Sequence, residues 1–284
     1  MSRLDRNQGL LFALPALLML AALIFYPLVY TGVLSVTDEA GGFVGMQNFS
    51  AMLGARLTAT AFWNTLIYVG FSIIFQMILG TAAGILLNQN FRGRGLVRST
   101  MLIPWVVPGI VAATTWAWMF HTEFGIVNYM LMSVHAIDAQ IGWLTNPNTV
   151  MPALIAVNVW KMFPFVAIMI LAGLQSVPET LYEAARVDGA SFRDEIRYIM
   201  LPQLRPVLIS VSLLLMIWGL NAITLIYAMT KGGPANRSLI TPIQIFRQAF
   251  EFFQLNQAAA LSLVFFLIIG LVMGIYIKLS EERE

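Results

Sequence analysis

The segment Val150–Gln175, VMPALIAVNVWKMFPFVAIMILAGLQ, decides the fold, because Lys161 is its single charged residue. An α-helix needs roughly 20 mostly apolar residues to cross the hydrocarbon core of a bilayer, and this stretch exceeds that length. A helix that is packed in a soluble core is usually shorter or amphipathic. We therefore interpret the segment as a transmembrane helix.

Similar apolar stretches recur on both sides of this segment, separated by islands of charge. Of the 284 residues, 59% are hydrophobic and 11% are charged, against roughly 25% charged in an ordinary soluble domain. A water-soluble globule of this composition would lack a polar surface. We predict an all-α membrane protein with a single transmembrane domain over residues 1–284. Its expected spans lie near residues 10–34, 62–87, 99–120, 150–175, 206–229 and 258–277.

The basic residues gather on one side of the predicted bilayer. Because connecting loops alternate between sides, eleven of the 16 Lys and Arg residues fall on the side that holds both termini. Lys and Arg are enriched in the cytoplasmic loops of membrane proteins. We therefore expect cytoplasmic termini and a cytoplasmic 176–205 segment. The net charge of +2 indicates this topology, and no nucleic-acid partner is indicated.

Proline and glycine residues predict where spans bend or pack closely. Pro104 and Pro108 remove two backbone donors near the start of the third span, so we expect that helix to be kinked or irregular there. Small residues four apart let helix backbones approach each other. Two such patterns are present, Gly80 with Gly84 and Gly270 with Gly274.

The 176–205 segment predicts a short cytoplasmic helix-turn-helix between the fourth and fifth spans. Ser176 and Glu179 have the spacing of a capping box, and Gly189 is a natural place for a helix to end. A second helix can begin at Ser191. By physical chemistry alone, this could also be a structural hairpin that lies on the membrane surface.

The same segment carries a sequence signature. It reads Glu183-Ala184-Ala185, three residues, Gly189, nine residues, Ile199, one residue and Leu201-Pro202. This spacing resembles the E-A-A-x3-G-x9-I-x-L-P motif of inner-membrane permeases of binding-protein-dependent ABC importers, with every fixed position present. Other stretches resemble the carbohydrate branch of that family, namely Phe43-Val44-Gly45, Arg92-Gly93-Arg94-Gly95-Leu96, Ile103-Pro104-Trp105 and Thr230-Lys231-Gly232-Gly233-Pro234.

The resemblance implies a role for this segment and a set of partners. In that family a short cytoplasmic helix docks on the ATP-hydrolysing subunit, which would make coupling residues of Glu183, Ala184, Ala185, Asp188 and Gly189. The implied partners are a pair of ATPase subunits, a second homologous permease, an extracytoplasmic solute-binding protein and membrane lipid. The implied location is the bacterial inner membrane.

The chain is not expected to be an enzyme or to bind a cofactor of its own. A phosphate-cradling loop requires the pattern G-x-x-x-x-G-K-[ST], and none of the three lysines follows a glycine. We therefore expect ATP and Mg on partner subunits. Cysteine is absent and the two histidines lie fourteen residues apart, which argues against a metal site in this chain.

The resemblance also implies a solute pathway along the fourth and fifth spans. The family's substrate-contacting positions match Phe165, Trp218, Gly219 and Ala222, and Asn221 lies among them. A sugar is the expected solute, since sugars stack on aromatic rings and bind amides. Gly219 and Ala222 depart from the asparagine-rich pattern of maltose-type members. Other sugars, polyols, sugar acids and glycerol phosphate therefore stay open.

Lys161 is unusual because it lies near the middle of the fourth span. Translocon scales put a lysine there at roughly 2.5 to 3.5 kcal/mol, and no Asp or Glu lies in a predicted span to pair with it. We expect Lys161 to face the aqueous pathway or a partner subunit. Snorkelling or a plain interface contact is the alternative.

Two other function classes compete with an importer subunit. Gly70-Phe71-Ser72 fits the G-x-S pattern of intramembrane serine proteases, but a serine nucleophile needs a base nearby. His121 and His135 both lie in or beside the loop after the third span. A secondary transporter usually carries acidic residues within its spans, and here every Asp and Glu lies in a loop or tail. Both rivals are therefore disfavoured.

Overall fold

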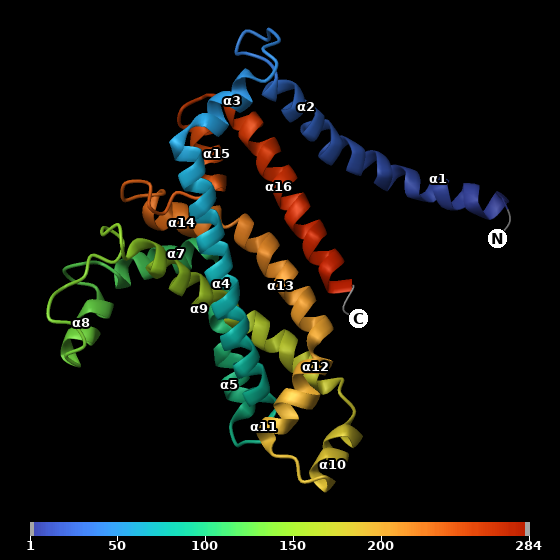
Figure 1. Cartoon of the computed structure of the whole chain (residues 1–284), viewed down its shortest axis with the longest axis vertical. Helices are drawn as coiled ribbons and strands as arrows, with labels where there is room; N and C mark the ends of the chain where they lie inside the picture. Colours follow the sequence, from blue (N-terminus) through green and yellow to red (C-terminus); the bar gives the residue numbers. More distant parts are fainter. Residues whose placement is uncertain (1–2, 282–284) are drawn as a thin grey trace. The chain divides into compact units, whose positions relative to one another are not determined.

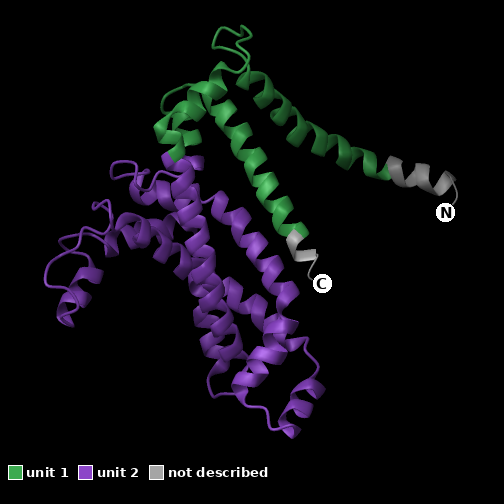
Figure 2. Cartoon of the chain, viewed as in Figure 1, with its two compact units in different colours: residues 1–59, 244–281 green, residues 60–243, 282–284 purple. Residues whose placement is uncertain are grey.

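The computed structural model describes residues 3–281, with the side chains of residues 12–278. The described chain is almost entirely helical and divides into two compact units (Figures 1 and 2). Unit 1 contains residues 1–59 and 244–281, and unit 2 contains residues 60–243. The expectation of a single transmembrane domain stays a prediction.

The described helices confirm an all-α membrane protein with about six spans. Four helices are long and apolar enough to cross a bilayer, and two bent helix pairs bring the number of candidate spans up to six. The four are Phe12–Ser35, Arg56–Asn88, Val150–Gln175 and Leu255–Lys278. The bent pairs are Arg94–Val106 with Gly109–Met119, at 94°, and Phe192–Gln203 with Arg205–Leu220, at 65°.

Unit 1 is held together by its last helix. This helix, α16 (Leu255–Glu281), packs against α2 (Tyr26–Ser35) and α3 (Gln47–Gly54). The Asn256 side-chain amide donates to the carbonyl oxygens of Leu34, at 3.0 Å, and Thr37, at 2.7 Å. These bonds satisfy carbonyls that the end of α2 leaves without helical partners.

Unit 2 holds the greater part of the helices. In chain order they are α4 (Arg56–Asn88, which begins in unit 1), α5 (Arg94–Met101), α6 (Ile103–Val106), α7 (Gly109–Met119), α8 (Ile126–Ser133), α9 (Val150–Gln175), α10 (Glu179–Val187), α11 (Phe192–Asp194), the π-helix η2 (Glu195–Met200), α12 (Leu201–Gln203), α13 (Arg205–Leu220), α14 (Ile223–Thr230) and α15 (Thr241–Phe250, which ends in unit 1).

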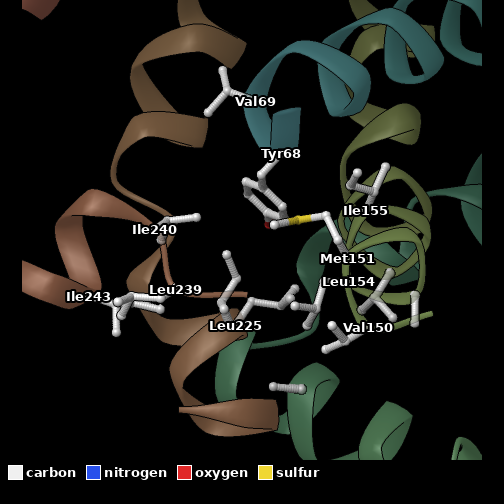
Figure 3. Packing of buried hydrophobic residues seen from close by; sticks show 14 of the residues in the cluster. Tyr68, Val69, Val150, Met151, Leu154, Ile155, Leu225, Leu239, Ile240 and Ile243 are labelled. Atoms are coloured by element: carbon white, nitrogen blue, oxygen red, sulfur yellow. The ribbon is translucent and has the colours of Figure 1, made fainter. Parts of the chain in front are cut away.

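Two hydrophobic clusters stabilise unit 2. The first joins α4, α9, α14 and the start of α15, and Figure 3 shows its side chains around Tyr68, Leu154 and Leu225. The second joins α9 and α13 to the 176–205 segment. Its buried members are Ile85, Val166, Ile170, Leu174, Tyr182, Met200, Leu204, Val211 and Leu215. The segment therefore rests on the same packed core as two membrane helices.

The glycine pattern in α4 confirms close helix packing. A Cβ atom added to Gly80 would lie 2.4 Å from Cβ of Val166, and one added to Gly84 would lie 2.7 Å from a methyl carbon of Ile170. Glycine is thus what lets α4 approach α9. At Gly270 and Gly274 no atom of the described chain lies within 4 Å of such a Cβ, so that pattern brings no helix close here.

The third span is kinked as predicted, and the bend is nearly a right angle. Helix α6 ends at Val106, Val107 and Pro108 are extended, and α7 begins at Gly109. The residue before a proline is pushed out of the helical region by the pyrrolidine ring, which explains the conformation of Val107. The bend of 94° follows from these two residues.

The fifth span, expected near residues 206–229, is interrupted. Helix α13 ends at Leu220 and α14 begins at Ile223, so that Asn221 and Ala222 interrupt the span. The amide of Asn221 explains the break in part, because it donates to the carbonyl oxygen of Ile217 at 2.9 Å. Asparagine side chains compete in this way with backbone hydrogen bonds of a helix.

Residues 176–205 form the expected pair of short helices, with two differences. The prediction of a capping box at Ser176 is wrong, because Ser176 is the C-cap residue of α9 and its hydroxyl donates to Gly173 O at 2.7 Å, while Pro178 takes the N-cap position of α10. The second helix does begin after Ser191, but most of it is the π-helix η2.

Pro202 follows η2 closely, as Pro27 follows the π-helix η1 (Ala21–Phe25). A proline lacks the N–H for a regular turn and crowds the carbonyl four residues before it.

Candidate functional site

A cavity of about 160 Å³ lies inside unit 2, at the break between α13 and α14. Five of the six residues predicted for the solute pathway line it, namely Lys161, Trp218, Gly219, Asn221 and Ala222. Lys161 comes from α9, Trp218 and Gly219 from the end of α13, and Asn221 and Ala222 from the break itself. The break thus places the Asn221 amide in the lining of the same cavity as Lys161 and Trp218.

Phe165, the sixth predicted residue, belongs to an aromatic group beside the cavity. Its ring lies edge-on to Trp218, with ring centroids 4.9 Å apart. It also stacks on Trp105 of α6, at 5.6 Å. Such pairs stabilise a fixed ring orientation beyond the effect of apolar burial. Trp218 is 41% exposed, so part of the indole remains accessible.

Lys161 caps the end of the broken third span. Its ammonium group donates to Val107 O at 2.5 Å, and lies 3.4 Å from Trp105 O and 3.5 Å from Pro104 O. The last carbonyl groups of a helix lack partners inside the helix and carry partial negative charge. A cation from α9 therefore compensates the carbonyls that the kink releases. The expectation that Lys161 faces the aqueous pathway or a partner subunit did not include these carbonyl groups of its own chain.

Four further polar residues line the cavity that the sequence analysis did not assign to the solute pathway. They are Ser72 and Gln76 of α4, Asn158 of α9 and Thr224 of α14. The Gln76 amide donates to the Asn158 carbonyl oxygen at 3.2 Å, and Gln76 is 2% exposed. A usable signal was present, because Ser72 and Gln76 lie four residues apart, on one face of an otherwise apolar helix.

The serine protease alternative gains nothing from this geometry. The Ser72 hydroxyl is buried and makes no hydrogen bond to any described residue. His121 stacks on Phe124 in the loop after α7, with ring centroids 3.5 Å apart, and no histidine lines the cavity. A serine nucleophile without a neighbouring base is inert.

The predicted coupling residues lie on α10 and at its C-terminal end. Glu183 and Ala184 are exposed and Ala185 is half-buried, while Asp188 caps the helix. The N–H of Gly189 donates to Arg186 O at 3.1 Å, and the N–H of Ala190 donates to Ala185 O at 2.9 Å. This pair of bonds is a Schellman motif, which requires a left-handed residue after the cap.

Gly189 supplies that left-handed residue, with φ of +79°. No atom lies within 4 Å of a Cβ added there, so space does not demand glycine. Backbone conformation does, because a side chain with a Cβ is strained in this region. The chain then enters η2 through Ser191, whose hydroxyl and backbone N–H both bond to Asp194. These bonds to the carboxylate hold the pKa of Asp194 below its usual value.

Residues 76–283 match the family described as binding-protein-dependent transport system inner membrane component. The chain belongs to this family. The permease is 34% identical to the trehalose/maltose transport system permease protein MalF of Thermococcus litoralis, over 99% of the chain and 96% of that protein. It is 32% identical to the sulfoquinovosyl glycerol transport system permease protein SmoG of Agrobacterium fabrum, over 99% of the chain and 92% of that protein.

The fold of the permease also resembles solved structures of ABC transporters. A chain of a bacterial ABC transporter involved in the import of the acidic polysaccharide alginate superposes with a TM-score of 0.88, at 21% identity, with 99% of each chain covered. A chain of the MetNI methionine ABC transporter superposes with a TM-score of 0.59, at 16% identity, covering 84% of the permease and 99% of that chain. The permease is thus a multi-pass inner-membrane component of an ABC importer.

Proposed function

We propose that the permease forms half of the translocation pathway for a sugar or sugar-like solute. The observation that carries the proposal is the cavity at the α13–α14 break, where Trp218, Asn221 and Lys161 meet. Interrupted helices are where many membrane transporters place their solute sites, because a break frees polar backbone groups inside the bilayer. The solutes in the printed names of two relatives, trehalose/maltose and sulfoquinovosyl glycerol, support a sugar.

A second permease subunit would complete the pathway. The cavity measures about 160 Å³, whereas pockets that enclose small ligands usually measure roughly 300–1,000 Å³. Trp218 and Asn221 are both exposed at its edge. A homologous subunit that presents a similar half would enlarge the space around the solute and bury these side chains.

Coupling to ATP hydrolysis would run through α10. Glu183, Ala184 and Ala185 would contact an ATPase subunit, while Asp188 and Gly189 hold the helix end. Helix α10 has nine residues, and isolated helices of fewer than about 12 residues are marginal in water. ATP and Mg would be bound by the ATPase dimer, since the sequence of the permease has no phosphate-binding loop. An extracytoplasmic binding protein would deliver the solute.

The proposed orientation places both termini and the 176–205 segment in the cytoplasm. Single cysteines at Ser191 and Asn236 test it, because the chain has no natural cysteine. In intact cells, Asn236→Cys should react with a membrane-impermeant maleimide and Ser191→Cys should not. Labelling of Ser191→Cys from outside would overturn the orientation.

Reconstituted transport tests the function itself. The permease is assembled in liposomes with the ATPase subunits, second permease and binding protein encoded beside it, and uptake of the binding protein's ligand is measured. We expect ATP-dependent uptake, and we expect its rate to be at least about tenfold lower in Trp218→Ala. This corresponds to a rise of roughly 1.4 kcal/mol in the activation free energy of the rate-limiting step. Leu271→Ala, a change at an exposed site of α16 that belongs neither to the cavity lining nor to α10, is the pathway control. Uptake that needs no ATPase subunit would refute the proposal.

The coupling role has its own test in Glu183→Lys and Gly189→Val. The first reverses a contact charge, and the second penalises the left-handed turn by about 1–2 kcal/mol. Both variants should insert normally but lose bound ATPase subunits or their solute-stimulated hydrolysis. Gly189→Asn is the matched control, because asparagine tolerates the left-handed region. Full ATPase association and wild-type stimulation in Glu183→Lys and Gly189→Val would show that α10 does not couple.

A further inference from the structure

Glu195 is the one charged side chain that is buried among the residues with described side chains, at 8% exposure. It is the first residue of η2, directly behind the proposed coupling helix. A buried carboxylate is unfavourable unless it is paired and hydrogen-bonded. Glu195 belongs neither to the proposed solute pathway nor to the residues proposed to dock on the ATPase. We therefore infer its role from the group that it bonds.

The partner of Glu195 is Arg186 of α10. The Arg186 Nε–H donates to Oε1 of Glu195 at 3.2 Å, across the turn that contains Gly189. Arg186 also approaches Glu179 on its own helix, with Nη1 3.8 Å from Oε1. The side chain of Glu195 is 10% exposed and that of Glu179 is 72% exposed. The bond to Glu195 is therefore the shorter and drier of the two.

The elements that this bond connects have different surroundings. Helix α10 presents Glu183 and Ala184 to solvent, whereas η2 continues into buried Met200 and Leu204 at the foot of α13. Tyr182 of α10 packs in the same cluster. Burial, followed by the nearby charges of Glu195 and Glu179, raises the pKa of Tyr182. Arg186 lies near both of these carboxylates.

We propose that Arg186 and Glu195 form a clasp, an ion pair that fixes α10 against η2. Through this clasp a movement of α10 would be transmitted to α13. This inference rests on the proposed coupling function. Without the clasp, α10 would be joined to η2 by the turn at Gly189 and by the Tyr182 contact. Both clasp residues are positioning residues, because neither belongs to the surface proposed to meet the ATPase.

The clasp predicts unequal effects of its two halves. Removing one partner of a buried ion pair leaves the other charge uncompensated, while exposed pairs contribute little. Arg186→Gln strands the buried carboxylate of Glu195. Glu195→Gln leaves Arg186 in solvent, where its side chain is already 59% exposed. Arg186→Gln should therefore be the more harmful substitution, and adding Glu195→Gln to it should partly restore function.

The experiment uses the complete reconstituted transporter and measures solute-stimulated ATP hydrolysis together with the number of ATP molecules hydrolysed per solute imported. We expect Arg186→Gln to raise that ratio about tenfold, Glu195→Gln about threefold or less, and the double variant to lie between them. Arg186→Lys should recover most of the loss, because it keeps the charge. Glu179→Gln is the matched control and should behave as wild type. Complex yield and thermal unfolding show whether each variant is folded.

The outcomes separate the clasp from the coupling function beneath it. If Glu183→Lys uncouples the transporter while Arg186→Gln keeps a wild-type ratio, the clasp is refuted and the coupling role stands. If Glu183→Lys has no effect either, the coupling role itself is wrong. Equal, additive losses in Arg186→Gln and Glu195→Gln, or an equal loss in Glu179→Gln, would also refute the clasp.

Discussion

Helix α9 and the α6–α7 pair both contain proline within an apolar span, yet one is continuous and the other bends by 94°. In α9, Pro164 is buried inside a helix of 26 residues. In the third span, Val107 and Pro108 are extended and separate two helices. Proline alone therefore does not decide whether a span breaks.

The carbonyl groups released at the break of the third span have a partner in α9. Those of Pro104, Trp105 and Val107 lie within reach of the Lys161 ammonium group. The continuous helix thus supplies the cation that the broken one needs. In hydrocarbon, irregular backbone is tolerated where protein supplies hydrogen bonds. A break in one span and a charge in its neighbour are, in this protein, two parts of one feature.

The largest effect should come from removing that cation. In Lys161→Met the carbonyls of the kink lose their donor, and an unsatisfied buried polar group costs about 1–3 kcal/mol. We expect a lower unfolding temperature in detergent and a strong fall in uptake. Lys161→Arg should retain most of both, since it keeps a cationic donor. Unchanged unfolding and uptake in Lys161→Met would mean that the kink needs no cap.

An effect on stability alone, without a direct effect on the cavity, is expected where two continuous helices meet. Gly80→Val would force side-chain atoms into Val166, and overpacking of this kind costs about 1–3 kcal/mol. Differential scanning fluorimetry of the purified complex should report the loss. The control is Gly270→Ala in α16, where a Cβ meets no described atom within 4 Å. Equal losses in both variants would show that the α4–α9 contact has no special role.

The smallest effect concerns the second break. Asn221→Ala removes the bond to the Ile217 carbonyl oxygen, and a single hydrogen bond contributes about 0.5–1.5 kcal/mol. We expect a modest fall in stability and a larger fall in uptake, because the amide also lines the cavity. Ser210→Ala, which removes a hydroxyl that donates to Pro206 O in the same helix and lies outside the cavity lining, is the control. A variant with normal uptake kinetics would remove Asn221 from the pathway.

The spans were predictable because lipid imposes a length and a composition on each of them. For α9 both ends match the prediction, since charge and polarity change sharply at Val150 and Gln175. The kink at Pro108 was predictable for a local reason, the missing backbone donor. The family motif likewise depends on residues that are close in sequence.

What the sequence did not reveal depends on contacts between distant residues. The donor for Val107 O lies 54 residues further along, and nothing near Lys161 announces it. The break at Asn221 contains no proline, and the apolar segment around it is long enough for an uninterrupted span. The sequence therefore carried no local signal that predicts this break. Gln76 and Asn158 lie 82 residues apart in the sequence, so neither residue indicates the other as its partner. Their partnership appears once α4 and α9 are packed together.

The contact between Lys161 and the kink also bears on how the chain is made. The ribosome completes residues 94–119 before it reaches α9, so the carbonyl groups of the kink are present in the membrane when the lysine arrives. A lysine at mid-membrane opposes insertion by roughly 2.5 to 3.5 kcal/mol when no partner is present. Here the partner precedes it. The order of synthesis thus lets the fourth helix enter the bilayer beside the carbonyl groups that accept hydrogen bonds from Lys161.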